Sequence, residues 1–431
     1  MNFQDDNNVM DDLRETTSIL VFECIGLNIK YYIQPNFHSL IVKDVCELLE
    51  MTFKLADITI TNEYLKEMIE ERIALYYKQI APPRSNGNTF VRIKPNIDKM
   101  KEKVEYLQKI PQPEQRTTEW YEFRYKHLTA SNIWKTFISE SSRNQLIFEK
   151  CQPLNTSKYS SHVSLDTPMH WGQKYEPLSV MLYEQLYNTK VSDFGCIPHK
   201  TIEFLAASPD GINTDETSLR YGRMLEIKNI VNREITGIPK MEYWVQMQLQ
   251  MEVCELNECD FLETRFIEYN DIIDFENDKT SVHKGLIMLF MTGNGQPKYE
   301  YAPLNITSEE EYMEKWQETI MEKYNDLTWI KNIYWKLDQI SCVLVLRNKL
   351  WFSSVVNELK EIWNIIEEEK ISGNYIHRGP KKSTQSRIKK KGNENDNNIE
   401  MSSTCFINVN VNVNVTHDSE SIEEKYDDTC I

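Results

Sequence analysis

A short segment near the middle of the chain alternates charged and apolar residues in the pattern of a half-buried β-strand. It reads Met-Leu-Glu-Ile-Lys at 224–228, and the side chains of a strand point alternately to its two faces. Glu226 and Lys228 therefore lie on one face, while Leu225 and Ile227 enter the core. This pattern constrains the fold more than any other feature, because it predicts a sheet whose charged residues gather at one place.

A second segment, Ala-Ser-Pro-Asp-Gly at 207–211, follows an apolar strand and puts Asp210 at a strand end or turn. The separation of 16 positions between Asp210 and Glu226 suits two neighbouring strands joined by a loop. That pairing would bring two carboxylates and Lys228 to one edge of the sheet. Because a Glu-x-Lys triplet alone is common on exposed strands and helices, the interpretation depends on the combination of the two segments.

Such an edge is suited to hydrolysis of a phosphodiester. Carboxylate oxygens are the ligands that Mg²⁺ prefers, and the ion polarises a phosphoryl oxygen and activates bound water. Lys228 would orient the water and offset the charge that builds in the transition state. The sequence therefore predicts a Mg²⁺ site on Asp210 and Glu226.

Two helices are expected to flank these strands. The run His-Trp-Gly-Gln-Lys-Tyr-Glu-Pro at 170–177 opens the first and puts Glu176 in its first turn, where an interaction with the helix dipole is the plainer interpretation. The second helix carries Tyr243, Gln246 and Gln250 on one face. Amides on that face point either to solvent or to the active-site water and a substrate phosphate.

A further candidate site lies upstream, in a helix that bears Trp120 and ends near His127. Ser131 is expected to cap the next helix, which we predict from Ile133 onward. A helix N-terminus with Arg124 beside it is suited to binding an anion. Capping plus a surface arginine is the alternative.

Overall charge argues against nucleic acid at first sight. The 431 residues contain 49 Lys+Arg and 66 Asp+Glu, a net charge of −17, whereas phosphate contacts need positive charge. The 40% hydrophobic residues exclude a wholly disordered chain, and no apolar run is long enough to span a membrane. The polar N-terminus is not that of a secretory signal, so we expect an intracellular protein.

The cysteines and histidines predict neither a disulfide framework nor a zinc site. The nine cysteines form no Cys-x-x-Cys pair and the eight histidines form no His-Glu-x-x-His pair. We interpret the cysteines as reduced thiols.

The ends of the chain differ from its middle. Residues 17–33 are β-branched and aromatic and predict a hairpin, followed by helices at 39–53 and 62–79. Near the other end, helices are expected at 309–335 and 350–370, joined by a short apolar run at 342–346.

The tail separates its charges. Residues 370–391 hold eight basic residues and no acid, and residues 392–431 hold nine acids and one lysine. We expect the tail to be disordered. Its basic part would serve as a nuclear-localisation or phosphate-binding element, or simply as a solvated linker.

These patterns divide the chain into four regions. We predict an α+β N-terminal region of unknown role (1–99), an α/β core (100–308), a helical C-terminal extension (309–376) and a disordered basic-then-acidic tail (377–431).

Five blocks in the core resemble a known family. RTTEWYEFRYKHLTASN, HWGQKYEP, ASPDG, LEIK and YWVQMQLQMEV occur in the order and spacing of the YqaJ-type viral recombinases. That family includes the lambda-phage exonuclease and belongs to the PD-(D/E)xK nucleases. The resemblance covers roughly residues 116–270, and the wording of the segment from 228 to 264 is most similar to versions from large nucleocytoplasmic DNA viruses.

The resemblance implies a restriction-endonuclease-like core and a DNA exonuclease that digests duplex ends, 5′→3′, in viral recombination, repair or genome processing. It implies Mg²⁺, with Mn²⁺ as a substitute, held by Asp210, Glu226 and Glu176. Catalysis would involve these acids with Lys228 and Gln246, and the 5′-terminal phosphate would be bound by Arg124 and Ser131.

Other consequences of the resemblance concern partners and alternatives. Ring-shaped trimers occur in the family, a single-strand annealing protein is a further expected partner, and the host cytoplasm or nucleus is the expected place of action. An endonuclease of the same fold acting on RNA or structured DNA stays open, as does a non-catalytic DNA-binding scaffold, although no catalytic position is degenerate.

Overall fold

The computed structural model describes residues 7–34, 36–56, 60–79, 84–87, 96–115, 117–154, 165, 167–304 and 310–379. The predicted tail therefore lies outside the described residues except for its first three, 377–379. Arg116 and residues 81–83 of the predicted break at 81–87 lie outside them as well.

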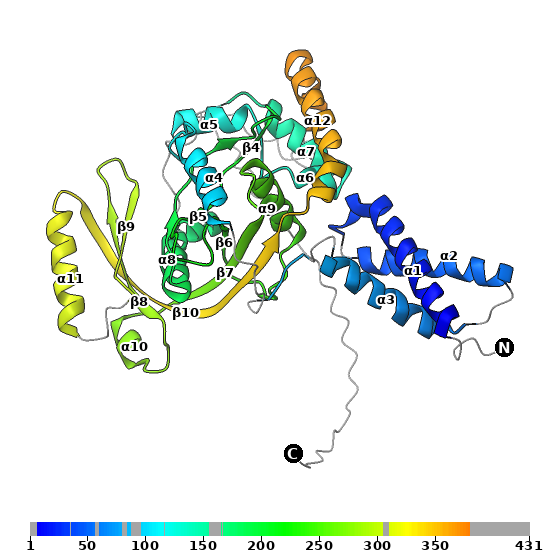
Figure 1. Cartoon of the computed structure of the whole chain (residues 1–431). Coiled ribbons are helices and arrows are strands. Elements are labelled where there is room, and N and C mark those ends of the chain that lie inside the picture. Colours follow the sequence, from blue (N-terminus) through cyan, green and yellow to red (C-terminus); the bar gives the residue numbers. More distant parts are fainter. Residues whose placement is uncertain are drawn as a thin grey trace, which may run out of the picture. The chain divides into compact units, whose positions relative to one another are not determined.

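A seven-stranded mixed sheet forms the centre of the described chain (Figure 1). β6 and β7 pair in parallel, and the other neighbours pair antiparallel. In spatial order the strands are β2 (Val191–Ser192), β5 (Gly211–Asn213), β6 (Met224–Asn229), β7 (Glu258–Glu268), β10 (Thr328–Leu346), β8 (Lys284–Met291) and β9 (Pro297–Tyr301).

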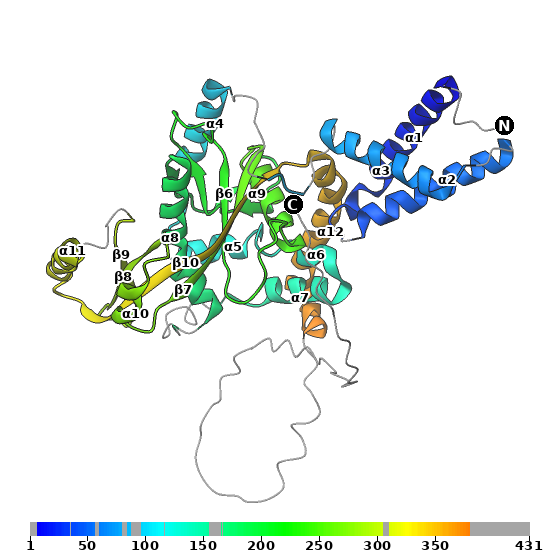
Figure 2. The same ribbon diagram turned by 90° about the horizontal axis from the view of Figure 1, so that it is seen from below.

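Two helices cover opposite faces of the sheet beside β6 (Figure 2). α8 (Pro168–Tyr187) contributes Tyr183 to a buried cluster with Leu225 and Ile227. α9 (Met241–Val253) buries Trp244 in the main core on the other side. The predicted α/β core, a central mixed sheet flanked by helices, is confirmed, and Leu225 and Ile227 are buried as the alternation of the strand requires.

A second, three-stranded sheet includes β1 (Leu128–Thr129), which lies between Arg124 and Ser131 of the upstream candidate site. Its order is β1, β4 (Leu205–Ala207) and β3 (Ile197–Pro198), with β1 and β4 parallel. The helices of this part of the chain are α4 (Ile97–Lys109), α5 (Thr118–Tyr125), α6 (Lys135–Ile138) and α7 (Glu140–Cys151). β1 pairs with β4, so the segment after α5 is joined directly to the strand that leads to Asp210.

The predicted N-terminal hairpin is wrong, because residues 17–28 belong to a helix. α1 (Asn7–Asn28) buries Leu13, Val21 and Ile25, which lie on one helical face despite their β-favouring neighbours. The two helices expected next are confirmed as α2 (Phe37–Ala56) and α3 (Asn62–Gln79), with the short η2 (Ile29–Tyr31) between α1 and α2. The described part of this region is therefore helical rather than α+β.

The prediction of a purely helical C-terminal extension is also wrong. The chain forms the 19-residue strand β10 between two helices, α11 (Glu310–Lys323) and α12 (Lys349–Ser372). The short helix α10 (Ile272–Asn277) lies earlier in the chain, and η4 (Asn374–Arg378) follows α12. β10 is rich in β-branched and aromatic residues, and it pairs with β7 on one side and β8 on the other. The region after residue 309 thus completes the central sheet.

The described helices differ from membrane-spanning helices in length or hydropathy. Among the described residues, no helix combines the length and the apolar character that a membrane span needs.

Candidate active site

Asp210 stands where the chain passes from the smaller sheet to the central one. The apolar strand before it, β4, pairs with β1 and β3, so it is β5 that neighbours β6, with Gly211 opposite Leu225. The backbone N–H of Ile227 donates to Asp210 Oδ2 over 2.7 Å. The predicted approach of Asp210 to the Glu226 strand is confirmed, although the strand that neighbours β6 follows Asp210 and does not precede it.

Gly211 allows this junction to pack closely. A Cβ atom at this position would lie 2.2 Å from Val191 Cγ1 on the adjacent strand β2. A side chain at this position would therefore force Val191 or its strand β2 to shift, which the glycine after Asp210 avoids.

Glu226 and Lys228 form an ion pair on the α9 side of the sheet. The Glu226 side chain is 0% exposed and accepts from Lys228 Nζ through Oε1, while the lysine side chain is 22% exposed. The ammonium group also lies 5.0 Å from the centre of the Tyr243 ring. Glu226 is thus held from one side by a cation that still reaches the surface.

The other oxygen of Glu226 is held by Gln250, for which the sequence left open a solvated position or a role toward the active-site water and a substrate phosphate. Gln250 Nε2 donates to Glu226 Oε2 over 2.7 Å and to the Ser208 carbonyl over 3.3 Å. Gln246, the glutamine that the resemblance implicates, is half-buried one turn earlier. Among the hydrogen bonds of the described residues, none joins Gln246 to the acids.

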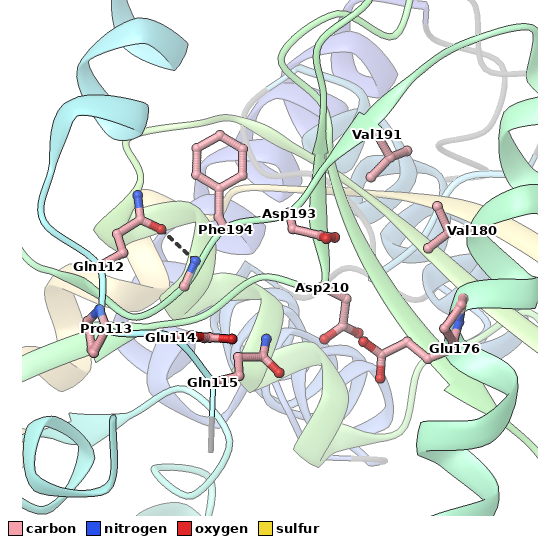
Figure 3. Close-up of a pocket in the computed structure, with 12 residues that line it drawn as sticks. Gln112, Pro113, Glu114, Gln115, Glu176, Val180, Val191, Asp193, Phe194 and Asp210 are labelled. Atoms are coloured by element: carbon pink, nitrogen blue, oxygen red, sulfur yellow. Dashed lines mark hydrogen bonds between the residues drawn. The ribbon is translucent and has the colours of Figure 1, made fainter. Parts of the chain in front are cut away.

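Glu176 reaches the same place from α8. It lines a cavity of about 560 Å³ together with Asp210, Glu114 and Asp193. Figure 3 shows the carboxylates of Glu176 and Asp210 pointing toward one another. The predicted first-turn position of Glu176 is wrong, since α8 begins at Pro168 and Glu176 lies two turns into the helix.

The acidic residues around Asp210 lie close to one another, and this affects the pKa values of Asp210 and Lys228. Burial raises the pKa of Asp210 well above its ordinary value, the Glu226 carboxylate raises it further, Lys228 opposes this and Glu176 adds to it. Burial lowers the pKa of Lys228, but Glu226 and Asp210 outweigh it and leave that pKa raised. The cluster therefore holds more acidic groups than the one lysine can neutralise, and the ionised form of Asp210 is disfavoured.

The donor set fits a divalent cation. Asp210 and Glu226 offer carboxylate oxygens, and Mg²⁺ is commonly bound through one or two carboxylates with water completing its shell. A cation there would relieve the repulsion that raises the pKa of Asp210. Within the described ranges, no three acidic, histidine or cysteine side chains form a complete metal-binding group.

The structure brings Arg124 and Ser131 together. Arg124 Nη2 donates to Ser131 Oγ over 2.9 Å, and its guanidinium group lies 4.5 Å from the centre of the Trp120 ring. Arg124 lines a cavity of about 440 Å³ together with Thr129, Asn132 and Lys150. We call this cavity the Arg124 pocket.

The expected helix N-terminus at Ser131 is wrong. The next helix, α6, begins only at Lys135 with Trp134 as its N-cap residue, and it is four residues long. Asn132 instead accepts a hydrogen bond from the Thr129 backbone. The positive character of the Arg124 pocket therefore comes from side-chain cations rather than from a helix dipole.

A buried thiol connects the Arg124 pocket to the acids. The Cys196 side chain is 1% exposed, and burial raises its pKa while interactions with Arg124 and Ser208 oppose the rise. Ser208 in turn accepts from Gln250. The two candidate sites are therefore joined through the segment that precedes Asp210.

Comparison with known proteins finds similarity over part of this chain. Residues 119–257 match the family model of the YqaJ-like viral recombinase domain. An uncharacterized protein of Acanthamoeba polyphaga mimivirus is 30% identical over 309 residues, which are 61% of this chain and 54% of that protein. The chain thus spans about half the length of this relative, and the predicted resemblance to proteins of large DNA viruses is confirmed.

Two solved structures are also similar to this chain. One is an alkaline exonuclease, LHK-Exo, from Laribacter hongkongensis, with 20% identity, coverage of 61% of this chain and 97% of the other, and a TM-score of 0.36. The other is LHK-Exo in complex with dAMP, with 21% identity, the same coverage and a TM-score of 0.35.

Proposed function

We propose, with the YqaJ-like viral recombinase domain at residues 119–257 as the premise, that this protein is a Mg²⁺-dependent DNA exonuclease. It would hydrolyse phosphodiester bonds at duplex ends, 5′→3′, in viral DNA recombination, repair or genome processing. The observation that carries the proposal is the meeting of Asp210, Glu226 and Lys228 at the β5–β6 junction. In this proposal the protein acts on viral DNA inside the host cell and passes the remaining strand to an annealing protein.

The acids would hold the cation. Asp210 and Glu226 would bind Mg²⁺ with help from Glu176, and Mn²⁺ would substitute for it. When bound, the ion would supply Lewis acidity and a more acidic water molecule. Its two principal ligands would be oriented by the chain itself, since the Ile227 backbone fixes Asp210 and Gln250 fixes Glu226.

Lys228 would act at the point where the bond is broken. Its raised pKa keeps it protonated at neutral pH, so it cannot serve as a general base there. We assign it instead to orienting the attacking water and to stabilising the negative charge that builds on the phosphoryl oxygens. Burial of Glu226 beside it keeps this charge in a weakly screened environment.

The Arg124 pocket would bind the 5′-terminal phosphate. An arginine fork with a hydroxyl beside it offers several donors to phosphate oxygens, and the stacking of Arg124 on Trp120 limits the rotation of the guanidinium group. The connection through Cys196 and Ser208 then relates the bound end to the acids.

Digestion of matched DNA substrates tests the proposal. Wild type and Asp210→Asn are incubated with a linear duplex and with a sealed circle of the same sequence, with Mg²⁺ or with EDTA. An end-dependent exonuclease releases nucleotides only from the linear DNA, only with the cation and only in the wild type. Cleavage of the circle would favour the endonuclease, and equal activity of the two proteins would exclude catalysis at Asp210.

A further inference from the structure

A buried lysine supports the Arg124 pocket from below. The Lys150 side chain, on α7, is 8% exposed, and its Nζ donates to the carbonyl oxygens of Arg124 over 2.7 Å and of His127 over 2.6 Å. These carbonyls lie at the end of α5 and just beyond it, where a helix leaves acceptors without intrahelical partners. A lysine at that end satisfies them, so Lys150 fixes the backbone that carries the guanidinium group.

Lys150 has further capacity for an anion. An ammonium group has three N–H donors, and the two backbone carbonyls account for two of them. Lys150 also lines the Arg124 pocket. One N–H and the positive charge are therefore available to a ligand there.

The charges facing Lys150 are mainly positive. Arg124 faces it from α5, His127 from the turn that follows, Lys370 from α12 and Glu149 from its own helix. Burial, then Arg124, then Lys370 lower the pKa of Lys150 to about 7, and Glu149 opposes this. Glu149 is also engaged by Lys135 over 2.6 Å, and Lys370 pairs with Glu367 over 3.0 Å, so Glu149 is shared with another cation and is not dedicated to Lys150.

We propose that Lys150 is a positioning and specificity residue of the Arg124 pocket, which holds Arg124 in place and takes up a proton from solvent when a terminal phosphate enters. This inference rests on the proposed function, because it takes the end of a DNA strand as the ligand. It adds a pH dependence that Arg124 alone cannot give, since arginine stays protonated.

Linkage determines the direction of the effect. A lysine with a pKa of about 7 is mostly neutral at pH 8, and a phosphate dianion nearby favours its charged form. The phosphate itself, with its second pKa near about 6, is already a dianion at pH 8. Binding is then accompanied by uptake of a proton on Lys150. As the pH rises from the pKa of Lys150 in the free protein to its pKa in the complex, the affinity for a phosphorylated end falls by up to about tenfold per pH unit.

Calorimetry measures this proton directly. The full chain carrying Asp210→Asn is titrated in EDTA, so that no digestion occurs, with two duplexes that differ only in a 5′-phosphate or a 5′-hydroxyl. At pH 8, two buffers of different ionisation enthalpy give the number of protons exchanged. We expect uptake approaching one proton with the phosphorylated duplex and none with the hydroxyl duplex.

Three variants in this background separate charge from packing. Lys150→Arg keeps a permanent charge and should retain the preference for phosphorylated ends without proton uptake. Lys150→Met should lose both. Lys284→Met is the matched control, because Lys284 also donates to two backbone carbonyls at a helix end, those of Phe275 and Asp278, and should change neither quantity.

The outcomes are distinguishable. A phosphate preference without proton uptake, unchanged in Lys150→Met, would overturn the role of Lys150 and leave the exonuclease intact. The absence of any phosphate preference in every protein would overturn the 5′-phosphate role of the pocket and this inference with it. If Lys150→Met does not fold, proton uptake by the parent protein and its loss in Lys150→Arg still decide the question.

Discussion

Gln250 holds Glu226 in place, with its Nε2 2.7 Å from Glu226 Oε2 and also donating to the Ser208 carbonyl at 3.3 Å. One amide group therefore joins the strand that carries Glu226 to the segment that leads into Asp210. Since the Gln250 side chain is itself 0% exposed, water cannot easily replace it. The position of the two acids relative to one another depends on this contact.

Gln250→Ala should slow hydrolysis more than Gln246→Ala. Loss of a partner to a buried carboxylate costs about 1–3 kcal/mol. If the transition state loses the same amount, the rate falls about 5- to 150-fold. Single-turnover digestion of a linear duplex at saturating Mg²⁺ measures the chemical step. A larger effect of Gln246→Ala would favour the glutamine that the family resemblance implicates.

Asp210→Asn should stabilise the metal-free protein while it abolishes activity. The raised pKa of Asp210 means that its ionised form is disfavoured in the fold, and relief of that cost is on the order of 1 kcal/mol. Stability from the protonated carboxyl is present below about pH 4 and is lost as the pH rises through the folded pKa. Urea unfolding in EDTA should thus show an advantage of the variant that grows from pH 4 toward neutrality.

Mg²⁺ should stabilise the wild type and not Asp210→Asn. A ligand that binds only the folded state adds about 2.7 kcal/mol at a concentration 100 times its Kd. Thermal unfolding with increasing Mg²⁺, and with Ca²⁺ as a second cation, measures this without any substrate. Equal shifts of Tm in the two proteins would place the cation elsewhere.

Arg124→Ala should remove the advantage of a 5′-phosphate. A hydrogen bond to a charged group contributes about 1.5–3 kcal/mol, so digestion of phosphorylated ends should slow by about 10- to 100-fold. Digestion of 5′-hydroxyl ends should change far less. Initial rates on the two end-labelled duplexes provide the comparison, and equal slowing of both would exclude the phosphate role.

Gly211→Ala should destabilise the β2–β5 pair. Its new Cβ would lie 2.2 Å from Val191 Cγ1, and overpacking of this kind costs about 1–3 kcal/mol. Val191→Ala removes the clashing atom, so the double variant should recover much of the loss. Chemical denaturation of the four proteins forms the cycle, and additive losses would show that the two residues do not meet.

The alternation in residues 224–228 was sufficient to predict the face of Glu226 and Lys228, because the period of a strand is local. The role of Gln250 was not predictable in the same way. Three polar residues shared its helix face, and only the depth at which α9 packs on β6 selects the one that reaches Glu226. Lys150 gave no local signal, since its acceptors belong to α5 and the turn that follows it, far away in sequence.

The two errors in secondary structure have a common cause. In both segments the structure depends on contacts with residues that are distant in sequence. In α1 these contacts override the local β propensity, and in β10 the neighbouring strands determine that the segment is extended. The β-branched residues of α1 follow the helical burial pattern, whereas the segment after α11 becomes a strand because β7 and β8 offer it two edges. Such partners lie far away in sequence, and a periodicity cannot reveal them.

The place of β10 between β7 and β8 also has a consequence for biosynthesis. The strands that carry the acids leave the ribosome long before β10 does, and until then β7 and β8 each present an unpaired edge. The sheet can close only when the chain has been made as far as Leu346. A truncated product ending at residue 304 would expose both edges, which favours aggregation, so the proposed active site could form on a complete sheet only after β10 has been made.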